Sequence, residues 1–460
     1  MRLWNHLRQQ LLKYKEQVLC EESKQISFGS LLKTTEEFAK HLEGALCCAV
    51  FCDSEYMAAQ AILICFAAGV TALPLSKRYG EEHCKKILDK IRPDGILYDT
   101  MDSLVFKRLS HHAYMAPKVH PALILCTSGT TGEPKGAMLT EDNILCNLED
   151  IAMYFDITEQ DRILIARPLY HGAVLVGEFL TALCKGTKLY FDSGMFSPAR
   201  TVSLLERHKI SVFCGTPTLL LLMSRFLRKE HGKTLKRIVV SGECMSVETG
   251  RRIAAAFQDA KIYHVYGLTE ASPRLSYLPP ELFSKHPDFV GYPLRSVKMR
   301  VKRVDGSLAA EGERGVLFAC GENIMAGYYG DVEKTAAVLQ DGWLNTGDIA
   351  SFQENGLLKI HGRVDDLIIK AGMNIYPQEI EGMLKRDNRV AEALAYGYPT
   401  EFGTQIGLKI AGDFHSVSQV RQLCVNCLAP YQMPAKIELV SHLEKNASGK
   451  IKRGENNVGI

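Results

Sequence analysis

Apolar runs alternate with helix-length segments through the first three-quarters of the chain. A helix is expected between the members of each successive pair of runs, for example near 174–184 and near 247–257. Strand–helix–strand units at this spacing are typical of parallel sheets with helices on both faces. We therefore predict an α/β fold with two sheet subdomains, roughly 40–120 and 160–270. The apolar runs lie at 48–52, 70–73, 162–166, 187–191, 238–240 and 261–265.

The pattern changes at about residue 297. Residues 297–304, VKMRVKRV, alternate between apolar and basic side chains and are followed by Asp305 and Gly306. Alternation that ends in an Asp-Gly turn predicts a half-exposed antiparallel hairpin. Short strands and glycine-rich turns continue to His361. This part should form a β-rich subdomain.

A small α+β unit is expected after Gly362 and Arg363. Helical patterns recur near 377–385 and 416–428, and no low-complexity linker precedes them. We therefore divide the chain into a large N-terminal domain, 1–363, and a small C-terminal domain, 364–460.

Residues 56–76 carry no charged side chain and are the one candidate in this sequence for a membrane segment. Polar residues, a glycine and a proline interrupt it, and its most apolar part is too short to span a bilayer. A buried helix that runs into a buried strand accounts for it better. The N-terminus lacks the apolar core of a secretory signal, so we expect neither secretion nor a membrane span.

Composition excludes several classes of protein. The 460 residues are 46% hydrophobic and 23% charged, with a net charge of only +3, so nothing favours nucleic-acid binding. The 14 cysteines are dispersed, and several lie in apolar runs. The CxxC pair, Cys424 and Cys427, has no second pair at zinc spacing. We expect free thiols and a cytoplasmic protein.

The sequence TSGTTGEPKG at 127–136 is the strongest local signal for phosphate binding. It follows the apolar run 122–126 and combines glycines, hydroxyl groups and one lysine. A Walker loop needs a helix directly after its lysine, whereas here the next helix is expected only after Thr140. The loop can still direct amides and hydroxyls at phosphate. Its candidate ligands are Thr127, Ser128, Gly129, Thr130, Thr131, Gly132 and Lys135.

This loop resembles the phosphate-binding signature of the adenylate-forming superfamily, which includes acyl- and aryl-CoA synthetases, peptide-synthetase adenylation domains and luciferases. Further motifs follow in that family's order, and the resemblance covers roughly 25–455. They are PLYH at 168–171, YGLTE at 266–270, GERG at 312–315, WLNTGD at 343–348, GRVDD at 362–366, GMNIYP at 372–377 and ASGK at 447–450.

The resemblance implies a two-step ligase that uses ATP and Mg²⁺. A carboxylate would attack the α-phosphate of ATP to give an acyl-adenylate and pyrophosphate, and a pantetheine thiol would then displace AMP. The protein's task is to neutralise charge where a carboxylate meets a polyphosphate.

The same resemblance assigns the nucleotide residues. Glu270 would hold Mg²⁺, an ion that takes oxygen ligands, and Thr269 would contact the α-phosphate. Tyr266 would face the adenine, and Asp348 would bind the ribose hydroxyls with help from Arg363. The adenine-side segment would be Ser241, Gly242 and Glu243.

Lys450 is the main catalytic candidate, because an ammonium group could bridge the substrate carboxylate and the α-phosphate. The family commonly has Pro and Thr in this segment, whereas this chain has Glu444 and Asn446. Asp365 matches the family's hinge, about which the small domain would rotate after adenylation. Gly372 would then face the incoming thiol.

The acid substrate should lack an α-amino group. Relatives that activate amino acids carry an Asp near the position held here by His171, which instead resembles a catalytic or substrate-side residue of acyl- and aryl-CoA ligases. Other expected pocket residues are Thr216, Gly267 and Ser272. Glu178 and Arg274 could add polarity, although surface positions are an equal alternative for both.

The thiol acceptor stays open between CoA and an acyl-carrier protein. The N-terminal region is short for the family, and Glu141 replaces a frequent histidine. Trimmed relatives often load carrier proteins, which favours that acceptor slightly. A non-catalytic AMP-binding relative and an amino-acid-activating enzyme are the alternatives.

Overall fold

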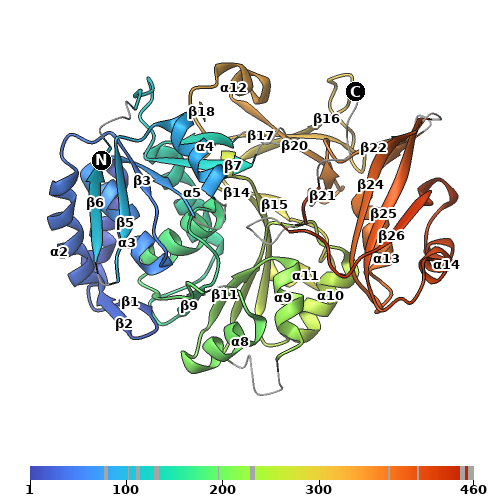
Figure 1. The fold of residues 1–460 in the computed structure, drawn as a ribbon, viewed down its shortest axis with the longest axis horizontal. Coiled ribbons are helices and arrows are strands. Elements are labelled where there is room, and N and C mark those ends of the chain that lie inside the picture. The colour runs from blue at the N-terminus through green and yellow to red at the C-terminus, as the bar shows by residue number, and fades with distance from the viewer. Residues whose placement is uncertain are drawn as a thin grey trace.

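The computed structural model describes residues 1–76, 81–101, 103–109, 114–128, 134–194, 196–227, 234–370, 373–400, 403–445 and 451–453. Figure 1 shows a large body, coloured blue to orange, and a smaller red unit beside it. Helices and several sheets are mixed throughout, which confirms the predicted α/β class with a large N-terminal and a small C-terminal domain.

The amino-terminal sheet has the strand order β18-β8-β7-β4-β3-β5-β6. Strands β3, β4, β5 and β7 are parallel, whereas β6, β8 and β18 pair antiparallel. These strands are β3 (Cys47–Val50), β4 (Thr71–Pro74), β5 (Gly95–Asp99), β6 (Leu104–Arg108), β7 (Leu123–Ser128), β8 (Pro134–Leu139) and β18 (Gly327–Tyr328). Helix α4 (Glu81–Ile91) precedes β5.

Helix α3 (Glu55–Ala68) joins β3 to β4. The Ser54 side chain accepts a hydrogen bond from the Met57 amide at its start, and Gly69 ends it with φ of +69°. Most of its side chains are buried, as expected for a helix that is apolar on all sides. The prediction of a buried helix and strand in 56–76 is therefore confirmed.

The central sheet has the order β15-β14-β13-β12-β11-β9-β10-β1-β2. Strands β1 and β9 to β13 are parallel, so their carboxyl ends meet at one edge. The strands are β1 (Val18–Glu21), β2 (Lys24–Ser27), β9 (Arg162–Ile165), β10 (Lys188–Phe191), β11 (Val212–Gly215), β12 (Arg237–Val240), β13 (Lys261–Gly267), β14 (Arg274–Leu278) and β15 (Tyr292–Pro293). The helices that follow these strands are α8 (Pro198–Arg207), α9 (Pro217–Ser224), α10 (Val247–Ala256) and α11 (Pro280–Phe283).

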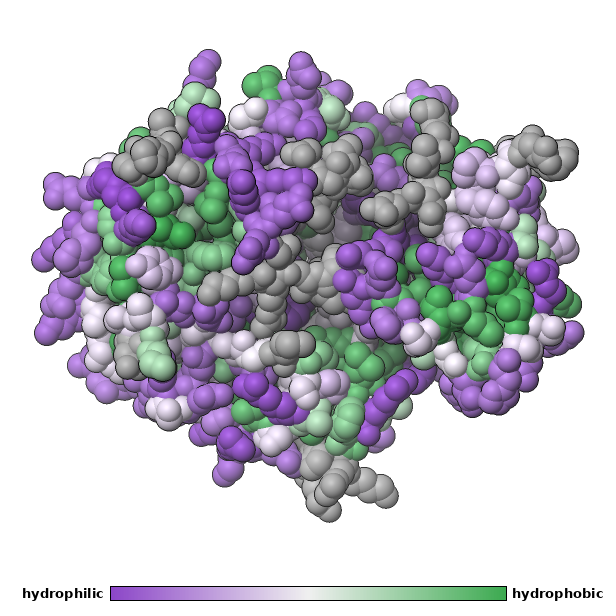
Figure 2. Space-filling model, viewed as in Figure 1, coloured by the Kyte–Doolittle hydropathy of each residue, from purple (hydrophilic) through white to green (hydrophobic). Residues whose placement is uncertain are grey.

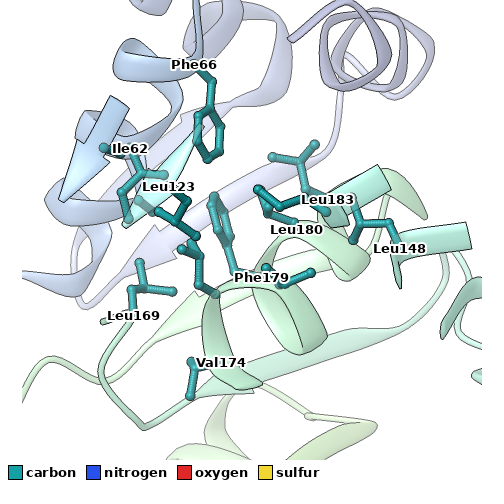
Figure 3. Close-up of a cluster of buried hydrophobic side chains, with 14 of the residues drawn as sticks. Ile62, Phe66, Leu123, Leu148, Leu169, Val174, Phe179, Leu180 and Leu183 are labelled. Carbon is teal, nitrogen blue, oxygen red and sulfur yellow. The ribbon is translucent and has the colours of Figure 1, made fainter. Parts of the chain in front are cut away.

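A shared hydrophobic core joins these two sheets. Figure 3 shows Phe66 of α3 and Phe179 pointing toward one another, with Leu180 and Leu183 beside them. The helix expected near 174–184 is present but contains a π-helical stretch, η3. Helical segments in this region are α1 (Arg2–Lys13), α2 (Phe28–Ala39), η1 (Lys40–Leu42), α5 (Glu141–Tyr154), α6 (Gly172–Val174), η3 (Leu175–Leu180) and α7 (Thr181–Cys184).

The bridging sheet forms the β-rich part expected from residue 297 onward, and it lies across the top of Figure 1. Its order is β16-β17-β20-β19, and β21 pairs antiparallel with the second half of β20, beyond the residues that pair with β19. Strand β16 is half-exposed, as predicted, and its partner β17 begins nine residues after Gly306. The elements are β16 (Lys298–Lys302), β17 (Gly315–Cys320), α12 (Val332–Val338), β19 (Leu339–Gln340), β20 (Trp343–Phe352) and β21 (Leu358–Arg363).

The small domain has its own hydrophobic core, drawn from residues between Ile368 and Ile437. Its helices confirm those expected near 377–385 and 416–428. The elements are β22 (Ile368–Lys370), β23 (Met373–Ile375), α13 (Pro377–Leu384), β24 (Val390–Thr400), β25 (Gly403–Gly412), α14 (Val417–Cys427), η5 (Pro430–Gln432) and β26 (Lys436–Leu439). The boundary at 363/364 stays a prediction, which this separate core supports.

Two surface properties complete the fold. On the face drawn in Figure 2, hydrophilic residues cover much of the surface, with apolar residues between them over both domains. No helix within the described ranges is long and apolar enough to cross a membrane. All fourteen cysteines are free, including Cys424 and Cys427 of α14.

Candidate active site

The glycine- and threonine-rich loop connects two antiparallel strands. Strand β7 leads into it and β8 leads out, with Thr127 paired to Lys135. Helix α5 begins only at Glu141, and the Thr140 side chain caps it by accepting a hydrogen bond from the Asn143 amide. A Walker loop would continue into a helix, so the prediction that this loop is of another type is confirmed. Gly129, Thr130, Thr131 and Gly132 lie outside the described residues, as does the side chain of Ser128.

Glu270 stands just beyond the carboxyl end of β13. It belongs to the short 3₁₀ turn η4 (Thr269–Ala271), and its Oε1 accepts a 2.8 Å hydrogen bond from the Tyr328 hydroxyl. Burial and the Glu270 carboxylate raise the pKa of Tyr328 well above its usual range, which keeps the phenol protonated as a donor. The Lys135 ammonium lies 5.6 Å from the centre of the Tyr328 ring. Glu270 and the phosphate loop therefore share one neighbour.

Tyr266, Asp348 and Arg363 form a second group at the same place. The Tyr266 hydroxyl donates a short hydrogen bond to Asp348 Oδ2, and Arg363 Nη1 donates to Asp348 Oδ1 at 3.0 Å. Burial and Asp348 together hold the pKa of Tyr266 far above its usual range. The strands that carry these residues are β13 of the central sheet and β20 and β21 of the bridging sheet. Side chains from two sheets thus meet around one carboxylate.

The segment Ser241–Glu243 follows β12 and is held in place by hydrogen bonds to residues at the end of β11 and the start of α9. The Ser241 amide donates to the Gly215 carbonyl at 3.1 Å, and Gly242 adopts φ of +92°. Glu243 Oε2 accepts hydrogen bonds from the amide and hydroxyl of Thr218, at 3.1 and 2.7 Å. Because that carboxylate holds the first turn of α9, it also holds this segment against the central sheet.

The four expected pocket residues lie near the same edge of the central sheet. Thr216 caps α9 through its hydroxyl, and His171 occupies the corresponding position before α6. A Cβ on Gly267 would lie 1.8 Å from the Pro273 carbonyl oxygen, so only glycine fits there. Ser272 is fully buried, and its hydroxyl has no hydrogen-bond partner among the described residues.

Two residues of uncertain position turn out to be buried. Glu178 is 1% exposed and Arg274 is 2% exposed, so the alternative of surface positions is wrong for both. Glu178 lies in the π-helical stretch and accepts a short hydrogen bond from Arg167 Nη2. Sequence reasoning missed Arg167 because a lone arginine before a Pro-Leu pair carries no periodic signal.

The tail around Lys450 is attached to the small domain on both sides. Lys445 Nζ lies 2.5 Å from Glu392 Oε1, and Arg453 Nη2 lies 2.5 Å from Glu381 Oε2. A β-bridge also joins Lys445 to Ile451. Lys450 itself and the expected thiol-side Gly372 lie outside the described residues. Asp365, the expected hinge, is exposed between β21 and β22.

A protein-held metal cluster is absent from the described part of the chain, where no group of three or more His, Cys, Asp or Glu side chains could hold an ion. Glu270 instead offers a single carboxylate beside the expected phosphate position. One carboxylate together with phosphate oxygens and water is how Mg²⁺ is usually bound alongside nucleotides. The residues present therefore fit an ion that arrives with ATP.

Comparisons with known proteins agree with this geometry. The family of AMP-binding enzymes matches residues 103–329. A feruloyl-CoA synthase from Amycolatopsis is 30% identical over 341 residues, covering 72% of this chain and 68% of that protein. A 2-succinylbenzoate–CoA ligase from Bacillus pumilus is 32% identical over 340 residues, again covering 72% and 68%.

Solved structures align over nearly the whole chain. The o-succinylbenzoate CoA synthetase of Bacillus subtilis in complex with its acyl-adenylate intermediate aligns with a TM-score of 0.86 at 25% identity, covering 97% of this chain and 96% of that one. The same enzyme with ATP and magnesium aligns with a TM-score of 0.85 at 26% identity, covering 97% and 98%. This chain belongs to the AMP-binding enzyme family, within the adenylate-forming superfamily of acyl- and aryl-CoA synthetases.

Proposed function

We propose that this chain is an acid–thiol ligase that uses ATP. Two groups of side chains carry the proposal: Tyr266, Asp348 and Arg363 in one, and Glu270 with Tyr328 in the other. Tyr266 and Glu270 both lie at the carboxyl end of β13, where α/β proteins bind nucleotides. The named relatives are CoA synthases and ligases, and one aligned structure holds an acyl-adenylate. Both observations support activation of a carboxylic acid as acyl-AMP.

In the first step, a carboxylate oxygen attacks the α-phosphorus of ATP and the bond to the pyrophosphate oxygen breaks. Thr269 and Lys450 would stabilise the charge that develops on the α-phosphate, and Lys135 would hold the departing pyrophosphate. Bound at Glu270, Mg²⁺ would neutralise phosphate charge. Asp348 would accept hydrogen bonds from the ribose hydroxyls while Tyr266 and Arg363 keep its carboxylate oriented.

In the second step, a pantetheine sulfur attacks the acyl carbon, its proton is lost and the bond to AMP breaks. We propose that the small domain turns about Asp365 between the two steps, which removes Lys450 and presents Gly372. The separate core of the small domain supports such a rigid movement. The relatives are named as CoA synthases and ligases, which favours CoA as the acceptor over the carrier protein that the short N-terminal region favoured.

We propose that the substrate is an aryl, fatty or other carboxylic acid that lacks an α-amino group. His171, where amino-acid-activating relatives carry an acid, supports this class. We place the reaction in the cytoplasm, on the ground that every cysteine is free.

The test is carboxylate-dependent exchange of pyrophosphate into ATP, measured with a panel of acids. Lys450→Ala should lower exchange about 100- to 1,000-fold, the usual cost of one transition-state charge contact. Lys452→Ala is the matched control, because that lysine is 57% exposed and only 3.8 Å from an exposed glutamate. Full exchange by Lys450→Ala would overturn its catalytic role. Nucleotide binding without exchange for any acid would favour a non-catalytic AMP-binding protein.

A further inference from the structure

A buried ionic group lies beside the expected acyl pocket, and we call its members Arg167, Glu178 and Arg274 the arginine cluster. We propose that the cluster binds an anionic group, such as a second carboxylate, at the far end of the acid substrate. This inference rests on the proposed function, because it names the chemical class of acid that the same site would activate.

The cluster is assembled from three separate elements. Arg167 follows β9, Glu178 lies in η3, and Arg274 begins β14. Arg167 donates to Glu178, and both Arg167 and Arg274 act electrostatically on that carboxylate. Gly177 leaves space for Arg274, since a Cβ there would lie 2.9 Å from Arg274 Nη2. Both guanidinium groups therefore lie near a single buried glutamate.

The charges of the arginine cluster do not balance. Two guanidinium groups face one carboxylate, which leaves one positive charge when Glu178 is ionised and two when it is protonated. Within the described residues, Glu178 is the one carboxylate that forms an ion pair with Arg167, and Arg274 forms an ion pair with no carboxylate, although it hydrogen-bonds to the Tyr154 side chain. An uncompensated charge in a protein interior is costly, whereas a paired one is tolerated. An anionic ligand would supply the missing charge.

Hydrogen-bonding capacity is also left over at this position. The Nε atoms of Arg167 and Arg274 are buried and have no partner among the residues the structure describes. The hydroxyl of Ser272, two residues before Arg274, is in the same state. Buried donors normally find partners, so two unused guanidinium donors near one glutamate indicate a binding site for an acceptor.

The location of the cluster fits the far end of an acyl group. Arg274 pairs with Gly267 across β13 and β14, and Gly267 directly precedes the Leu268–Glu270 segment where the phosphates are expected. Arg167 lies at the carboxyl end of β9, next to β11, which leads into Thr216. Expected nucleotide residues, pocket residues and the arginine cluster thus follow one another along a single sheet edge.

The experiment compares acids that differ only at the far end. Pyrophosphate exchange is measured for α,ω-dicarboxylic acids against monocarboxylic acids of equal carbon number, and for terephthalate against 4-methylbenzoate. We expect kcat/KM to be about 10- to 100-fold higher for the preferred diacid, as for a hydrogen bond to a charged group. Equal or better use of the neutral-ended acids overturns the inference and leaves the proposed function intact. If none of the acids supports pyrophosphate exchange, both the inference and the proposed function are overturned.

Two variants separate binding from a structural role. Arg274→Gln should lower kcat/KM for the diacid about tenfold or more while the neutral-ended acid keeps its rate. Arg237→Gln, at the opposite edge of the same sheet, should leave the ratio of the two acids unchanged. An equal loss for both acids in Arg274→Gln contradicts the inference. If that variant does not fold, the inference is still tested by the ratio of kcat/KM for the diacid to kcat/KM for the neutral-ended acid in the unaltered protein.

Discussion

The two edges of the central sheet each carry a cluster of charged residues, and the clusters differ in charge balance. At the amino-terminal edge, Arg237 pairs with Asp156 at 2.6 Å and with Asp161 at 3.1 Å. Lys261 pairs with Asp156 at 3.0 Å, so two cations meet two carboxylates. At the carboxyl-terminal edge, the arginine cluster keeps an excess positive charge. In the Arg237 cluster, which joins strands, the charges therefore cancel, whereas in the arginine cluster, where we expect a ligand, they do not.

The hydrogen bonds at the amino-terminal edge have a clear electrostatic effect. Burial alone would raise the pKa of Asp156, but hydrogen bonds from Arg237, Tyr263 and Lys261 hold it well below its usual range. The carboxylate is thus stabilised in its charged form by neighbours from strands β12 and β13. We expect changes at this edge to affect stability and changes at the carboxyl-terminal edge to affect activity.

The largest effect should come from Glu270→Gln at the carboxyl-terminal edge. Its amide oxygen can still accept the Tyr328 hydroxyl, so folding should be unaffected, but the negative charge that we assign to Mg²⁺ binding is lost. Exchange should fall about 100- to 1,000-fold, or roughly 3–4 kcal/mol. Thermal unfolding of the same sample provides the control, and an active variant would remove Glu270 from the site.

The next effect concerns His264, which lies in β13 between the two edges. Burial lowers the pKa of His264 to about 4, so the folded protein keeps the ring neutral. The unfolded chain binds a proton near pH 6.5, so stability from this group is complete above that pH and is lost as the pH falls toward about 4. The loss should be about 3 kcal/mol.

Urea unfolding of the unaltered protein and of His264→Gln, at pH 7 and pH 4.5, isolates this contribution. The variant should lose less stability on acidification than the unaltered protein does. Identical slopes of stability against pH in the two proteins would show that His264 does not titrate as described.

A smaller effect is expected from Arg237→Gln at the amino-terminal edge. Breaking a fully buried pair costs roughly 3–5 kcal/mol, but the Asp156 side chain is 46% exposed, so solvent should reduce the loss to about 2 kcal/mol. The midpoint of urea unfolding measures it. Exchange activity at 25 °C should be unchanged, and a selective loss of activity would remove the distinction between the edges.

The smallest effect should follow from Asp348→Asn. The asparagine keeps an acceptor for Arg363 but loses the charge that we expect to bind the ribose hydroxyls. We predict a KM for ATP raised about tenfold, the lower limit for a hydrogen bond to a charged group. The KM for the acid should stay the same. If only the KM for the acid changed, the assignment of Asp348 to the ribose would be contradicted.

Sequence patterns predicted the parts of this structure that depend on local chemistry. The start of a helix after Thr140 and the buried helix and strand within 56–76 follow from turn-forming and apolar side chains close by in the sequence. Tyr328 could not be predicted, because it reaches Glu270 from a strand 58 residues away.

The burial of Glu178 escaped prediction for a different physical reason. Regular helical periodicity fixes which face each residue occupies, but the π-helical stretch Leu175–Leu180 changes the residue count per turn. The spacing of apolar residues therefore gives no reliable face for Glu178. The roles of Lys450, Gly372 and the domain boundary stay predictions.

The β-bridge between Lys445 and Ile451 has a consequence for how Lys450 would be brought to the nucleotide and removed from it. Ion pairs from Lys445 to Glu392 and from Arg453 to Glu381 attach both flanks of this segment to the small domain, so in the proposed rotation Lys450 would move together with that domain. The effective concentration of the lysine side chain at the nucleotide would then depend on the orientation of the whole small domain rather than on the motion of a flexible tail. A lysine carried in this way would be either almost fully present or almost fully absent, which suits one site that must perform two different reactions in turn.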